Sequence, residues 1–170
     1  MQRFMYPFRA KVSMPDRVLE LIALILFIVA WMVTLYIYQK TNGQIPTHFN
    51  MNGVATQWSS KDSIWGISLV FSLSCLISAT AAYNHKLVNL PIRLKAEVLE
   101  RQLFLIARMC RCMTILLSVL WISALVSIAG KLMSVNSEAV ELLLRGSLIL
   151  LFIPAIYYTL KIWWIGRGYR

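Results

Sequence analysis

The chain has 170 residues, of which 59% are hydrophobic and 14% are charged. An average soluble domain carries roughly 25% charged residues. The composition of this chain excludes a disordered, a collagen-like and a disulfide-rich secreted protein. Its low charge and high apolar content indicate an integral membrane protein. A net charge of +10 would suggest nucleic acid as the partner of a soluble domain. A membrane protein instead gathers basic residues on its cytoplasmic side, so we expect the lipid bilayer and no nucleic acid as a partner.

Four apolar stretches are each long enough to cross a bilayer as a helix, which takes about 20 residues. They cover residues 18–38, 63–83, 112–130 and 142–160. The first is too long for the apolar part of a signal peptide and lacks a small-residue cleavage site, so we interpret it as an uncleaved anchor. Pro154 is expected to kink the fourth. The predicted fold is an all-α integral membrane protein, a four-transmembrane-helix bundle in a single membrane domain at residues 18–160.

The distribution of basic residues orients the predicted spans. The segments 1–17, 84–111 and 161–170 together hold 13 Lys and Arg, whereas the segments 39–62 and 131–141 hold 3. The positive-inside rule therefore places both basic tails and the loop 84–111 in the cytoplasm, and the loop 39–62 outside.

Charged residues near the span ends predict two ion pairs. Glu20 lies near the cytoplasmic end of the first span and is expected to pair with Arg108 or Arg111. These arginines lie in residues 94–111, whose helical pattern is expected to extend the third span into the cytoplasm, beginning after Pro91.

The fourth span carries a charged group about one turn from its outer end. Arg145 is preceded by Glu141, and this i,i+4 spacing predicts a pair on one helix face. Two interpretations stay open: a local ion pair at the membrane interface, or a charged outer cleft formed by Glu138, Glu141 and Arg145 with His48 and Asp62.

The outer loop contains a hairpin signal. Asn52-Gly53 favours a two-residue type I′ turn, because that turn needs positive φ at both positions. It predicts a short extracytoplasmic β-hairpin with the cross-strand pairs Met51–Val54, Phe49–Thr56 and Thr47–Trp58. One face would then be apolar and lie on the helix ends or the lipid interface, with Trp58 as its anchor. The other face would hold His48, Asn50, Ala55 and Gln57.

The polar face of this hairpin has two interpretations. It could present His48 and Asn50 as a binding site for a ligand or partner. It could also be a structural cap on the outer end of the bundle, with His48 hydrogen-bonded to a helix terminus.

The same loop carries a family resemblance. The letters P-T-H-F-N, then G, then W and S-K before an apolar span, fall on Pro46, His48, Phe49, Asn50, Gly53, Trp58 and Lys61. This pattern resembles the SdpI-like family of bacterial toxin-immunity membrane proteins, whose shared membrane domain is of unknown function. Asn89-Leu90-Pro91-Ile92, followed by Glu100-Arg101-Gln102, is similar to that family's N-Y-P segment, with Leu90 at the usual aromatic position.

This resemblance covers roughly residues 18–130. It implies a multi-pass protein of the bacterial cytoplasmic membrane, of a receptor, immunity or signalling type, whose outer loop binds a secreted peptide or a membrane protein partner. The residues expected to shape the motif are Pro46, Phe49, Gly53, Trp58 and Pro91.

No pattern indicates enzymatic chemistry. The sequence has no hydrolase, kinase, P-loop or zinc-protease motif. Its two histidines, His48 and His85, are predicted on opposite sides of the membrane, and its cysteines fit small apolar positions, so we expect no metal, cofactor or catalytic site. The alternatives to a receptor are a small transporter or permease-like subunit and a structural membrane subunit. The candidate binding residues are His48, Asn50, Gln57, Lys61, Glu141 and Arg145.

Overall fold

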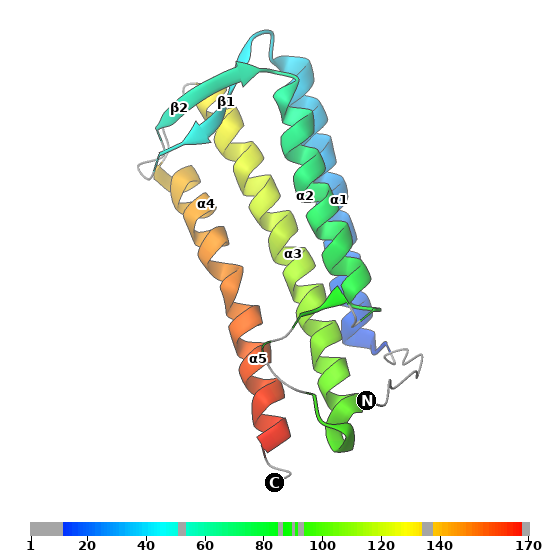
Figure 1. Cartoon of the computed structure of the whole chain (residues 1–170). Coiled ribbons are helices and arrows are strands. Elements are labelled where there is room, and N and C mark those ends of the chain that lie inside the picture. The colour runs from blue at the N-terminus through cyan, green and yellow to red at the C-terminus, as the bar shows by residue number, and fades with distance from the viewer. Residues whose placement is uncertain are drawn as a thin grey trace.

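The computed structural model describes residues 12–50, 54–84, 87–89, 91, 94–133 and 138–167. Its elements are, in chain order, α1 (Met14–Lys40), β1 (Gln44–Phe49), β2 (Ala55–Ser60), α2 (Ser63–Ala81), the 3₁₀ turn η2 (Ala96–Val98), α3 (Leu99–Leu132), α4 (Glu138–Leu150) and α5 (Phe152–Arg167). The helices run side by side as a long bundle, and the hairpin of β1 and β2 crosses one end (Figure 1). We call this the hairpin end, and the opposite end, where α1 begins and α5 ends, the far end.

Four helical segments are long and apolar enough to cross a membrane. They are Met14–Lys40, Ser63–Ala81, Ala96–Leu132 and Glu141–Arg167. Many apolar side chains on these segments face outward, such as Leu24, which is 55% exposed, and Ile149, which is 67% exposed. Soluble monomers rarely expose apolar surface on this scale. The four helices therefore indicate a multi-pass membrane protein.

The first helix begins earlier than predicted, at Met14 instead of residue 18. The reason is local: the Ser13 backbone N–H donates a hydrogen bond to the Asp16 carboxylate at 3.0 Å, and Pro15 stands in the first turn, where its missing N–H costs nothing. Asp16 therefore belongs to α1 and not to a basic tail at residues 1–17.

The other predicted spans also fall on helices. The third span is extended by a helix as predicted, because α3 is one continuous helix of 34 residues, but it begins at Leu99 and not at residue 94. Its cytoplasmic location stays a prediction. The fourth span is divided into α4 and α5 at Leu151. Pro154 has no N–H to donate to the carbonyl of Leu150, so the helix is interrupted one turn before it, where the kink was expected.

Helix α3 is the centre of the bundle and packs against α1, α2, α4, α5 and β1. Its Trp121 is fully buried, with Phe27 and Trp31 edge-on at ring-centroid distances of 5.7 and 5.5 Å and Phe71 stacked at 6.4 Å. The indole Nε1 donates to the Ser68 hydroxyl at 3.4 Å. One side chain thus joins α1, α2 and α3 in the half of the bundle nearer the hairpin.

Gln102 has the corresponding role at the far end. Its side chain is 1% exposed, accepts a hydrogen bond from the Lys95 backbone N–H at 2.9 Å and donates to the Ile162 carbonyl at 3.2 Å. A Cβ atom at Gly166 would lie 3.2 Å from the Gln102 Nε2 atom, so glycine leaves room for this contact. Gln102 therefore ties the segment before α3 to α5.

Candidate functional site

The hairpin rests on the bundle through its first strand. β1 packs on α3 and α2, and its Ile45 and Pro46 side chains are fully buried. β2 pairs antiparallel with β1 on the outer side, and most of its side chains are exposed. The hairpin thus has a covering strand and an outer strand.

The predicted hairpin is confirmed, but its predicted register is wrong. The observed cross-strand pairs are Gln44–Ser60, Ile45–Ser59, Pro46–Trp58, His48–Gln57 and Phe49–Ala55. Thr56 is skipped on β2 between Ala55 and Gln57, and Thr47 is skipped on β1 between Pro46 and His48, where it forms a bulge. Its hydroxyl is 3.4 Å from the Gln57 carbonyl oxygen, to which it donates, and 3.2 Å from the Ser59 hydroxyl. These two contacts stabilise the bulge at Thr47, and the shift that it causes is reversed at Thr56.

The loop that closes the hairpin also differs from the prediction. The Asn50 N–H donates to the Val54 carbonyl at 3.0 Å, and the Val54 N–H donates to the Asn50 side-chain oxygen at 2.9 Å. Val54 therefore pairs with Asn50, and the predicted pair Met51–Val54 is wrong. Gly53 and the expected Asn52-Gly53 turn lie outside the described residues. The Asn50 side chain therefore closes the loop.

The exposed surface of the hairpin combines polar and aromatic groups. His48 and Gln57 form a cross-strand pair with exposed side chains. Among the described residues the His48 imidazole has no hydrogen-bond partner, so the expected bond to a helix terminus is not formed there. Trp58 is 46% exposed and Val54 is 55% exposed. The predicted apolar face is therefore not covered by the bundle at these positions.

Lys61 lies at the junction between β2 and α2. Its ammonium is 4.6 Å from the centroid of the Tyr38 ring, a cation–π distance. The Tyr38 hydroxyl donates to Asp62 at 3.2 Å, and the Tyr38 ring packs against Trp65 at 5.1 Å. Lys61 is thus part of a contact between the ends of α1 and α2.

Glu141 and Arg145 form the predicted i,i+4 pair, with an N–O distance of 3.1 Å. Glu141 also accepts from Lys131 of α3 at 3.3 Å, so the group joins α3 to α4. Within the part of the chain that the structure describes, no hydrogen bond or ion pair joins this group to His48 or Asp62. The charged outer cleft formed by Glu138, Glu141 and Arg145 with His48 and Asp62 stays a prediction.

Two further motif residues, Phe49 and Pro91, differ in their burial. Phe49 is half-buried and packs against the core around Trp121. Pro91 is exposed in the segment between α2 and η2.

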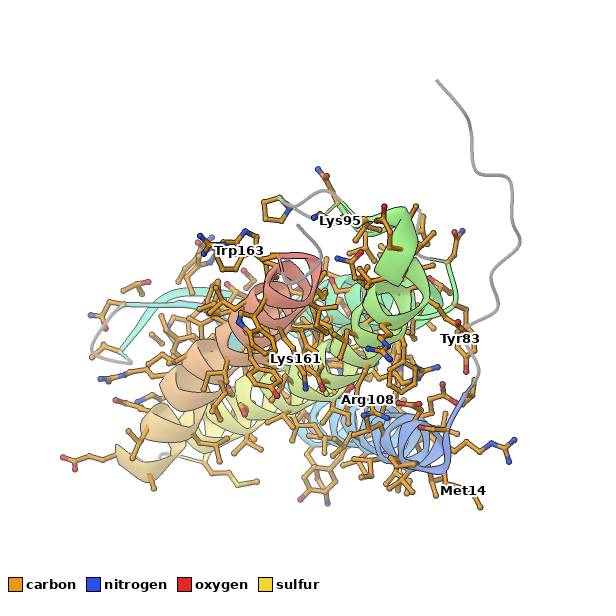
Figure 2. All side chains as sticks on the ribbon, turned by 90° about the horizontal axis from the view of Figure 1, so that it is seen from below. Met14, Tyr83, Lys95, Arg108, Lys161 and Trp163 are labelled. Atoms are coloured by element: carbon orange, nitrogen blue, oxygen red, sulfur yellow. The ribbon has the colours of Figure 1, made fainter. Side chains whose placement is uncertain are left out.

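A second cluster of polar side chains lies at the far end of the bundle, and the sequence predicted only some of its contacts. Arg111 Nε pairs with Glu20 at 2.7 Å, which confirms one of the two expected pairings. The Tyr83 hydroxyl, from the segment after α2, donates to the same Glu20 carboxylate. This hydrogen bond, together with partial burial, raises the pKa of Tyr83 above its ordinary value. Figure 2 looks onto this end, with Tyr83 and Arg108 labelled.

Asp16 completes this group and was missed. It is fully buried, accepts from Arg108 Nε at 3.0 Å and lies 3.9 Å from Arg111 Nη1. The available signal was spacing: Asp16 and Glu20 are four residues apart, and Arg108 and Arg111 three apart, so each pair shares a helix face. We call Asp16, Glu20, Tyr83, Arg108 and Arg111 the far-end charge cluster.

Comparison with known proteins gives one partial match. A family model described as a domain of unknown function (DUF1648) matches residues 25–72. No curated protein and no solved structure matches the chain. The matched segment runs from within α1 through the hairpin and into α2. The hairpin and the two helices that carry it are therefore consistent with an uncharacterised domain family.

Proposed function

We propose that the chain is a non-enzymatic membrane protein whose hairpin binds an extended segment of a peptide or of a membrane protein partner. The observation that carries this proposal is the free outer edge of β2. Within the described residues the sheet has two strands, and β1 is the strand that lies on the bundle. An exposed edge offers a row of backbone donors and acceptors to which a further strand can pair.

The composition of β2 supports this proposal. Proteins usually protect exposed edges with lysine, proline or a covering segment, but β2 has the sequence A-T-Q-W-S-S, without a charge or a proline. Trp58 supplies an exposed aromatic contact, and the pair His48 and Gln57 supplies polar groups beside it. Aromatic residues with polar neighbours are typical of binding surfaces.

A finer proposal concerns family and location. We infer from the resemblance of Pro46–Lys61 to the SdpI-like pattern that the protein is of the receptor, immunity or signalling type, and that the peptide is a secreted one. The same resemblance supports a bacterial cytoplasmic membrane, and the distribution of Lys and Arg supports an orientation with both termini in the cytoplasm and the hairpin outside.

The test is photocrosslinking in native membranes from a benzoylphenylalanine at position 58. The matched control is the same residue at position 163, because Trp58 and Trp163 are 46% and 47% exposed but lie at opposite ends of the bundle. A discrete partner crosslinked from position 58 and absent from position 163 supports the proposal. Its purified form should then lose affinity for the His48→Ala and Gln57→Lys variants.

The main alternative is a structural subunit in which the hairpin is a cap. The full burial of Ile45 and Pro46 under the hairpin favours this alternative. It predicts that position 58 crosslinks only to the protein itself, and that substitutions in the hairpin change the amount of protein without changing a binding phenotype. A small transporter-like subunit remains the other alternative, for which flux in proteoliposomes is the test.

A further inference from the structure

A cavity of about 320 Å³ lies between α1, α2 and α3, beside the far-end charge cluster. Ligand pockets in proteins usually have volumes of about 300–1,000 Å³. Most of the lining is apolar and includes Leu24, Phe27, Leu76 and Ala79. Because Leu24 and Leu76 are 55% and 51% exposed, the cavity opens between α1 and α2 on the outer surface of the bundle. In a membrane, this surface faces lipid.

One end of the cavity is polar. Glu20, Tyr83 and Arg111 line it there, whereas residues further along α1 and α2 are apolar. The Arg111 side chain is 3% exposed, with its Nε on Glu20 and its Nη1 near Asp16. Its Nη2 atom is buried and has no hydrogen-bond partner among the described residues. A buried donor without an acceptor is unfavourable, so an oxygen atom supplied by a ligand would stabilise this site.

The charges in this cluster decide what kind of group fits. Asp16 and Glu20 balance Arg108 and Arg111, so the guanidinium groups already have their countercharges. What the Nη2 atom of Arg111 lacks within the described residues is a hydrogen-bond acceptor, which can be an ester carbonyl, a phosphate or a carboxylate oxygen.

We propose that this cavity binds a membrane lipid, with one acyl chain along the apolar lining and a head-group oxygen on Arg111. Phospholipids and free fatty acids share this chemistry: an acyl chain that ends in oxygen acceptors. The site lies at the end of the bundle opposite the hairpin, so this proposal stands independently of the function proposed for the hairpin.

The experiment is native mass spectrometry of the full chain in mild detergent, titrated separately with phosphatidylglycerol, phosphatidylethanolamine and oleic acid. Ala79→Leu fills the apolar part of the cavity without touching the charge cluster. Ala155→Leu is the matched control, because Ala155 is also half-buried but lies on α5, outside the cavity. We expect Ala79→Leu to bind about tenfold more weakly than the wild type, and Ala155→Leu to bind like it.

The two lipid sources give different results. Retention of either phospholipid over oleic acid assigns the site to a bilayer phospholipid, and the reverse assigns it to a free fatty acid. Equal retention by Ala79→Leu and Ala155→Leu would mean that lipid coats the whole bundle surface, and this result, like the absence of any retained lipid, would overturn the proposal.

A second variant tests the head-group contact. Arg111→Lys keeps the charge opposite Glu20 but removes the Nη2 donor. We expect it to weaken retention of every lipid that binds the wild type, whereas unchanged retention would contradict the role of Arg111. If this variant does not fold, Ala79→Leu decides the question, because it leaves the charged residues intact.

Discussion

The substitution Asp16→Asn tests whether the far-end charge cluster stabilises the bundle. It removes the carboxylate that balances Arg108 and leaves Glu20, among the described residues, as the one acidic partner of the buried Arg111. Removing one partner of a buried ion pair typically costs about 3–5 kcal/mol of unfolding free energy. The Arg108 side chain is 28% exposed, so water can partly solvate it. We therefore expect a loss near the lower limit, about 3 kcal/mol.

The assay is equilibrium unfolding of the purified full chain in mixed micelles, followed by tryptophan fluorescence. The chain has six tryptophans, of which Trp121 is fully buried and reports on the core. The matched control is Asp62→Asn, because Asp62 is exposed and its carboxylate accepts, among the described residues, one hydrogen bond, from Tyr38. It should change the unfolding free energy by less than about 0.5 kcal/mol.

A double-mutant cycle separates the ion pair from other effects of the substitution. If Asp16 and Arg108 act as a pair, Arg108→Gln should cost clearly less in the Asp16→Asn background than alone, with a coupling of about 1 kcal/mol or more. An Asp16→Asn variant as stable as Asp62→Asn, or additive effects in the cycle, would refute the reasoning.

Three further predictions use the same unfolding assay. Trp121→Phe should lower the unfolding free energy by about 1–3 kcal/mol, because it shortens a fully buried side chain and removes its hydrogen bond to Ser68. An unchanged unfolding free energy would contradict a central role for this residue. Gln102→Ala should lower the unfolding free energy by about 1–3 kcal/mol, because it removes the hydrogen bonds to the Lys95 N–H and the Ile162 carbonyl. A loss within about 0.5 kcal/mol would argue against that bridge. Ile45→Ala should lower the unfolding free energy by about 2–5 kcal/mol and open the hairpin to limited proteolysis. His48→Ala should change the unfolding free energy by less than about 0.5 kcal/mol. Equal proteolysis of the two variants would contradict the division into buried and exposed hairpin residues.

The helices of this chain could be predicted from sequence because each one depends on a long apolar run. An apolar run of about 20 residues is long enough to span a bilayer as a helix. All four predicted spans fall on helices. The pair of Glu20 and Arg111 was predictable for a related reason. The alternation of the spans brings both residues to the same end of the bundle, and an acidic residue near an apolar segment needs a basic partner.

The register of the hairpin could not be predicted in this way. The pairs Met51–Val54 and Asn50–Val54 both fit the sequence around Asn52-Gly53, and hydrogen bonds of the Asn50 side chain favour the second. The Asn50 side chain accepts from Val54, and the Thr47 hydroxyl stabilises a bulge. Such competition between side chains and backbone is decided by small energies that a hydrophobic pattern does not contain.

Asp16 was missed for a different reason. The apolar run begins at Val18, so the acidic residue before it was grouped with the basic tail. The start of α1 is set by Ser13 and Pro15, and this places Asp16 inside the helix and under Arg108. The Nη2 atom of Arg111 has no hydrogen-bond acceptor within the described residues because of how three helices pack, and no local sequence pattern indicates this.

The central position of α3 has a consequence for the order of synthesis. Asp16 precedes its partner Arg108 by 92 residues along the chain, and Glu20 precedes Arg111 by 91. At the usual elongation rate of about 5–20 residues per second, both acidic side chains leave the ribosome about 5–20 s before their basic partners. During that interval Asp16 and Glu20 lack Arg108 and Arg111, and α1 and α2 lack the helix on which both pack. The first two helices therefore reach their final packing only after the third helix has been synthesised, and until then the two carboxylates at one end are without these arginine partners.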